Sequence, residues 1–117
     1  MDALALVDTF GVLSPHAMKY FVTEVQKRIK KRLEAHFHQY FGMWVANTIM
    51  ALSLGVEVMH TTILGIGKRS GNAPMEEIVM ELKTMYGVDV GIDCTKLTPL
   101  ANLVQRLTRL RCASAGE

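Results

Sequence analysis

Residues 33–64 read LEAHFHQYFGMWVANTIMALSLGVEVMHTTIL, and the order of elements in this stretch determines the architecture. Leu33–Tyr40 is a short run of strand length, and a helical segment follows from about Met43 to Leu54. Gly55 stands where helices commonly end in the left-handed conformation. The β-branched run Val56–Leu64 predicts another strand. Strand, helix and strand in this order predict parallel strands joined by a helical crossover.

The same alternation continues in both directions along the chain. Upstream, the apolar run Ala3–Val7 predicts a strand. Ser14 followed by Pro15 predicts the start of a helix, because serine caps helix N-termini and proline suits the first helical position. Downstream, apolar residues recur at helical spacing from Met75 to Tyr86, and a last helix is expected over about Thr95–Leu110. Three βα units in series predict an α/β protein with a parallel sheet.

Composition limits the class of protein. The chain has 117 residues, half of them apolar, which suffices for the core of one small domain. Its net charge of +2 indicates no nucleic-acid partner. No apolar run approaches the roughly 20 residues of a membrane-spanning helix, and the N-terminus does not resemble a signal peptide. The two cysteines, Cys94 and Cys112, form no CxxC motif, so we expect a cytoplasmic protein without a disulfide framework.

Polar residues gather where the predicted strands end. Asp8 and Thr9 follow the first strand, His36 and His38 close the second, and a glycine-rich loop over residues 65–72 follows the third. The carboxyl ends of parallel strands lie at one edge of a sheet, which is where α/β proteins place their active sites. We therefore expect a functional site at this edge.

His36-Phe37-His38 is the sharpest local signal. Residues i and i+2 of a strand point to the same side, so the two imidazoles can chelate one cation while Phe37 faces the helices. The alternative is two unrelated polar residues at a strand end. Asn72 is either a further oxygen ligand, suited to Mg²⁺, Mn²⁺ or Zn²⁺, or the N-cap of a helix beginning near Pro74. The glycine loop lacks the GxGxxG pattern and context of a dinucleotide-binding fold.

Two stretches together resemble one family. Residues 36–82 read HFHQYFGMWVANTIMALSLGVEVMHTTILGIGKRSGNAPMEEIVMEL, and residues 7–15 read VDTFGVLSP. Both are similar to the metal-dependent barrel family of isopropylmalate synthase, homocitrate synthase, citramalate synthase and hydroxymethylglutaryl-CoA lyase. The resemblance covers roughly residues 3–97. It implies the C-terminal part of a TIM (β/α)8 barrel, with three parallel βα units over residues 1–88, a helical extension over 89–112 and a tail over 113–117.

The resemblance also implies roles for individual residues. His36 and His38 correspond to metal ligands, Asn72 to a residue at the metal, and Thr9 to a residue that holds the carboxylate of an oxo acid. Asp8 is expected near the substrate or behind it. The family's aspartate ligand lies on an early strand, outside this chain. The implied activity is that of an acyltransferase, a Claisen-type synthase joining acyl-CoA to a 2-oxo acid. The isolated chain is expected to be inactive.

The sequence departs from the family pattern at several positions of the site. Gln39 and Tyr40 stand where the family has Asn-Asp, Lys68 replaces a glutamate and Ser70 an alanine. These changes bear on which oxo acid is used.

Three readings of function stay open. A lyase of the same family is the first alternative, although residues 65–72 lack the cysteine that the acyl-CoA lyase carries in this loop. An inert self-associating fragment is the second, because three strands leave two unpaired edges, and a homo-oligomer is expected.

The basic run Lys27–Arg32 is either a solvated helix end or a phosphate-binding group for coenzyme A.

Overall fold

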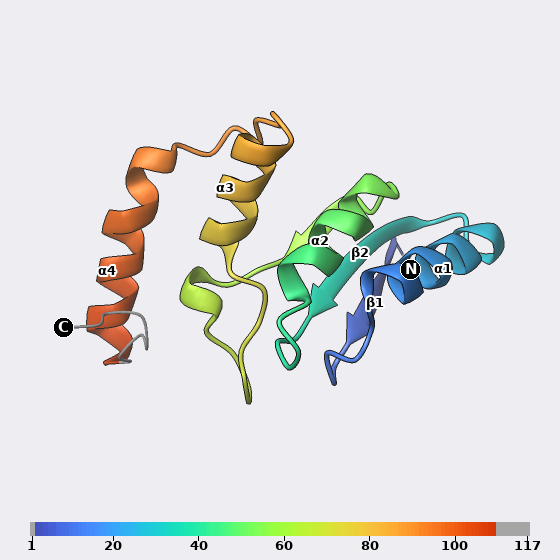
Figure 1. Ribbon diagram of the computed structural model, residues 1–117, viewed down its shortest axis with the longest axis horizontal. Helices are drawn as coiled ribbons and strands as arrows, with labels where there is room; N and C mark the ends of the chain where they lie inside the picture. Colours follow the sequence, from blue (N-terminus) through green and yellow to red (C-terminus); the bar gives the residue numbers. More distant parts are fainter. Residues whose placement is uncertain (1, 110–117) are drawn as a thin grey trace.

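A computed structural model describes residues 2–109 and shows a parallel sheet with helices in alternation (Figure 1). The strands pair in the order β1-β2-β3, each parallel to its neighbour. The elements are β1 (Ala3–Asp8), α1 (Pro15–Arg28), β2 (Arg32–Phe37), α2 (Trp44–Ser53), β3 (Val58–His60), the 3-10 turn η1 (Ile63–Gly65), α3 (Met75–Met85), the 3-10 turn η2 (Cys94–Lys96) and α4 (Leu97–Thr108). The predicted succession of three βα units and a final helix is confirmed.

Helices α1 and α2 cover one face of the sheet, and the main core lies between these layers. Alternate side chains of β2 point into it, and Phe37 is 1% exposed. The core cluster consists of Leu6, Met18, Val22, Leu33, Ala35, Phe37, Ala51 and Val56. The expectation that Phe37 faces the helical layer is therefore confirmed. A second cluster joins α2 to α3 through Ile49, Ala73, Ile78 and Leu82.

Local signals place the helix ends well. Ser14 caps α1, since its Oγ accepts a hydrogen bond from the Ala17 N–H at 3.2 Å, and Pro15 occupies the first helical position. Helix α2 lies within one residue of the predicted bounds at each end, and Gly55 follows it with a φ of +88°. These features depend on interactions within one or two turns of helix, which the sequence carries locally.

Two strands are shorter than predicted. Strand β2 ends at Phe37 rather than Tyr40, and β3 covers only Val58–His60 of the predicted Val56–Leu64. The cause is competing pairing. Thr62 bonds with the segment before α3, donating its N–H to the Ala73 carbonyl at 3.0 Å and accepting from the Met75 N–H at 2.9 Å. The chain then turns at Leu64, which has a φ of +59°.

Helix α4 stands at the end of the molecule far from α1 (Figure 1). A hollow of about 630 Å³ separates α3 from α4, and its lining includes Glu76, Glu77, Met80 and Leu97. Among residues 2–109, no helix is long and apolar enough to cross a membrane. The predicted tail, residues 113–117, and Cys112 lie outside the described residues.

Candidate metal centre

His36 and His38 come together at the carboxyl end of β2. His36 is the penultimate residue of the strand, whereas His38 lies one residue beyond its end, so the placement of both histidines on the strand itself is wrong. His38 remains extended because it forms an isolated antiparallel bridge with Asn72. The two rings therefore still lie on one side, with centroids 4.9 Å apart in an edge-on arrangement.

The two facing nitrogens have the separation of neighbouring metal ligands. Nε2 of His36 lies 3.2 Å from Nε2 of His38. Imidazole nitrogens bind Zn²⁺ at about 2.0–2.1 Å, which puts two adjacent ligands of one ion about 3 Å apart. Burial, followed by the nearby His38 and His60 rings, lowers the pKa of His36. A lowered pKa keeps this imidazole neutral, which is the form that binds metal.

Asn72 reaches the histidines through backbone pairing of the glycine loop. The segment after β2 pairs with residues 71–73: the Gln39 N–H donates to the Gly71 carbonyl at 3.0 Å, and the Ala73 N–H donates to the Phe37 carbonyl at 3.2 Å. The Asn72 Oδ1 is buried and has no hydrogen-bond partner among the described residues. A buried amide oxygen without a partner is costly and suits a cation.

The alternative role of Asn72 as a helix cap is wrong. Pro74 is the N-cap residue of α3, and no side chain caps that helix by a hydrogen bond. The first turn of α3 is joined to η1 by a hydrogen bond in which the Leu64 N–H donates to Glu76 Oε1 at 2.8 Å.

Asp8 and Thr9 lie in the loop that follows β1. Asp8 is buried, and its carboxylate turns back into its own loop, accepting the Val12 N–H at 3.2 Å and the Leu13 N–H at 3.0 Å. Thr9 is exposed, and its carbonyl accepts a hydrogen bond from Arg69 of the glycine loop at 2.8 Å. The structure thus places both residues at the expected edge, with Asp8 supporting the loop rather than pointing outward from it.

Two histidines lie side by side on the sheet face opposite the helices. Register aligns Val7 of β1, His36 of β2 and His60 of β3. His60 Nε2 lies 3.0 Å from Glu34 Oε2, and the His36 and His60 rings are 5.8 Å apart. No pattern in the sequence singled out His60, because local spacing does not show which residues of separate strands are aligned. Within residues 2–109, no group of three or more His, Cys, Asp or Glu side chains is arranged to hold a metal.

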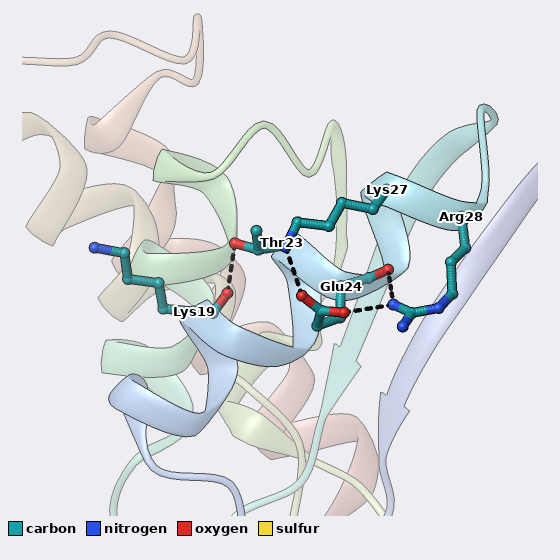
Figure 2. Close-up of polar contacts among 5 residues, drawn as sticks. All are labelled: Lys19, Thr23, Glu24, Lys27 and Arg28. Atoms are coloured by element: carbon teal, nitrogen blue, oxygen red, sulfur yellow. Dashed lines mark hydrogen bonds and ion pairs between the residues drawn. The ribbon is translucent and has the colours of Figure 1, made fainter.

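The basic cluster at the end of α1 is partly neutralised within its own helix. Figure 2 shows Glu24 between two cations, with Lys27 Nζ at 2.7 Å from Oε1 and Arg28 Nη1 at 2.6 Å from Oε2. The hydrogen bond from Lys27, then that from Arg28, lowers the pKa of Glu24. These contacts favour a solvated helix end over a phosphate site.

The arrangement of these groups at the carboxyl ends of the strands indicates a class of protein. The parallel strands end at a pair of converging imidazoles, and the segment bridged to His38 carries the buried amide oxygen of Asn72. This is the layout of α/β proteins that hold their active groups at the carboxyl ends of the strands.

Comparison with known proteins gives the family. The model of the HMGL-like family matches residues 2–104, and the chain belongs to this family. The 2-isopropylmalate synthase of Methanocaldococcus jannaschii is 42% identical over 110 residues, which are 94% of this chain and 21% of that protein. The homocitrate synthase AksA of Methanothermobacter thermautotrophicus is 39% identical over 110 residues, 94% of this chain and 28% of that protein. The chain thus spans between 21% and 28% of the length of these relatives.

A solved structure gives the same fold. The HMG-CoA lyase of Bacillus subtilis superposes with a TM-score of 0.85 at 26% identity, covering 98% of this chain and 41% of that one. Such relatives are TIM barrels, so the three βα units are those of part of a TIM barrel, as the sequence predicts.

Proposed function

We propose that the chain is part of a metal-dependent synthase that joins an acyl-CoA to a 2-oxo acid, and that it contributes His36, His38 and Asn72 to the metal centre. The observation that carries the proposal is the 3.2 Å approach of the two Nε2 atoms. It is the separation expected of two ligands on one ion. The unpartnered Asn72 Oδ1 supplies an oxygen donor on the adjoining segment.

The chain's residues divide the remaining work. A bound Mg²⁺, Mn²⁺ or Zn²⁺ would polarise the carbonyl of the oxo acid as a Lewis acid. His36 and His38 would hold that ion, and the Thr9 hydroxyl would bind the substrate carboxylate. Asp8 would act through the loop that carries Thr9, because both of its oxygens already accept backbone hydrogen bonds. The general base and the carboxylate ligand of the metal are assigned to parts of the parent enzyme outside this chain.

A lyase of the same family is the second candidate, and the likeness to HMG-CoA lyase favours it. Two observations favour the synthase. The synthases named above are 42% and 39% identical to this chain, against 26% for the lyase. The glycine loop over residues 65–72 also contains no cysteine.

Manganese binding by the purified chain tests the proposal. Calorimetric titration of the wild type is expected to show binding at micromolar Mn²⁺, and His36→Ala or His38→Ala should each abolish it. His16→Ala is the matched control, because His16 is an exposed histidine on α1. A wild type that takes up no manganese would refute a metal site that this chain holds on its own. A His16→Ala variant that loses as much affinity as the other two would refute the assignment of His36 and His38 as the ligands.

A further inference from the structure

Asn47 is a buried polar residue that the candidate metal centre does not use. It is 2% exposed on α2, whose other buried residues are Thr48, Ile49 and Ala51. Its Nδ2 donates to the Leu13 carbonyl at 2.6 Å, joining α2 to a loop 34 residues earlier in the chain. The carbonyl can only accept, so the orientation of the amide is determined by this bond.

The hydrogen bond from Asn47 to Leu13 adds little net stability. The Asn47 Oδ1 is buried and has no hydrogen-bond partner among the described residues. Burying an unpaired polar atom costs a free energy comparable to what one hydrogen bond returns. Packing alone therefore does not account for an asparagine at this position. Its side chain holds the loop that contains Thr9.

Leu13 is held from both sides. The Asp8 carboxylate accepts its N–H at 3.0 Å, while Asn47 donates to its carbonyl. Together these two side chains define the course of residues 9–13, which leave β1 and enter α1. Both side chains act on residues 12–13, so movement of either one would release this end of the loop.

The same loop lies directly against the histidine segment. Gly11 has a φ of +58°, and a Cβ at this position would lie 2.6 Å from the His38 carbonyl oxygen. The His38 N–H also donates to the Asp8 carbonyl at 3.4 Å. The backbone at Gly11 therefore lies directly against the backbone at His38, and the ring of Tyr40 also lies close to this glycine.

We infer that Asn47 is a positioning residue for the substrate: with Asp8 it holds the 9–13 loop against His38 and so sets the place of Thr9 relative to the metal. This inference rests on the proposed function, because Thr9 is taken as the residue that binds the oxo acid. Asn47 touches neither metal nor substrate. Its effect is transmitted through the Leu13 carbonyl.

Asn47→Asp is the sharpest test, because it preserves shape and replaces the donor with an oxygen facing the Leu13 carbonyl. Asn47→Ala is the second variant, since it removes the donor without placing a charge in the core. Thr48→Val is the matched control. Thr48 is likewise fully buried on α2, but its hydroxyl donates within the helix, to Trp44 O at 2.8 Å.

Site-resolved amide hydrogen exchange gives the first readout. Loss of one hydrogen bond worth about 1–1.5 kcal/mol corresponds to roughly tenfold faster exchange at Val12 and Leu13. Exchange in β2 should stay unchanged in the Asn47 variants, and Thr48→Val should leave Val12 and Leu13 as in the wild type. Unchanged exchange at these two amides, or equal acceleration in Thr48→Val, would overturn the inference.

Binding of pyruvate to the manganese-loaded chain gives the second readout. The Asn47 variants are expected to bind pyruvate about tenfold more weakly while their manganese affinity stays that of the wild type. Equal losses of both affinities would reveal a general softening of the core and refute positioning. A wild type that binds manganese but neither pyruvate nor a longer 2-oxo acid would refute the proposed function, whereas faster exchange at Leu13 in the Asn47 variants would still uphold the loop contact.

Discussion

Replacing Gly67 with alanine is expected to disturb the candidate metal centre by displacing the side chain of Asn72. A Cβ at Gly67 would lie 2.5 Å from Nδ2 and 2.6 Å from Cγ of Asn72. Carbon atoms in ordinary contact are about 3.5–4.0 Å apart, so the Asn72 amide must withdraw by about 1 Å. The φ of Gly67 lies outside the left-handed region, so alanine introduces no backbone strain.

The size of the effect follows from the tolerance of metal ligands. Ligand distances vary by only about 0.2 Å, so an amide displaced by about 1 Å no longer serves as a ligand. We expect the affinity for Mn²⁺ to fall by roughly 10–100-fold, the range seen when the support of a metal site is lost. The assay is calorimetric titration of the purified chain, with Ser70→Ala as an exposed control in the same loop.

A double-mutant cycle isolates the route of this effect. If Gly67→Ala acts only by displacing Asn72, it should cause no further loss in an Asn72→Ala background. Losses that add in the double variant would show that the glycine acts elsewhere. An unchanged affinity in Gly67→Ala would refute the reasoning altogether.

Two further predictions concern stability. Phe37→Ala should lower the free energy of unfolding in urea by about 3–5 kcal/mol, because the ring is 1% exposed, whereas Phe41→Ala, at 70% exposed, should cost less than about 1 kcal/mol. Burial, then the charges of Glu76 and Glu81, raises the pKa of Glu77. The folded state therefore binds this proton more tightly, and its stability falls as pH rises through the ordinary carboxyl range. Glu77→Gln should stabilise the chain slightly at pH 7 but not at pH 3, in paired thermal melts; equal gains at both would contradict this.

Helix ends were predictable because their causes are local. The Ser14 hydroxyl caps α1 by accepting from an N–H three residues further along, and Gly55 follows α2 in a left-handed backbone conformation. The ends of β2 and β3 were not predictable in the same way. Gln39 and Thr62, which were predicted to lie in strands, pair instead with the segment around Asn72 and Ala73. Strand propensity cannot choose between two partners that both offer hydrogen bonds.

The candidate site shows the same division. The i, i+2 spacing predicted that His36 and His38 face one way, and they do so although His38 lies outside the strand. The sequence left two roles open for Asn72, metal ligand and helix cap, and only the structure excluded the role of helix cap. Asn47 was invisible as a site residue. The one sequence signal was a polar amide within an apolar helical segment. This pattern indicates that the amide is buried, but it does not show which group the amide binds.

The sequence by itself determined the alternation of strands and helices, the parallel sheet and the shared direction of the two histidines, because these follow from spacing within a single element. Only the tertiary structure decided the 3.2 Å approach of the imidazoles, the inward turn of Asp8 and the bond from Asn47 to Leu13. Residues as far apart as Leu13 and Asn47 meet only when the intervening chain is ordered. The entropy of that ordering is offset by the whole core rather than by the contact itself, so no local pattern encodes the contact.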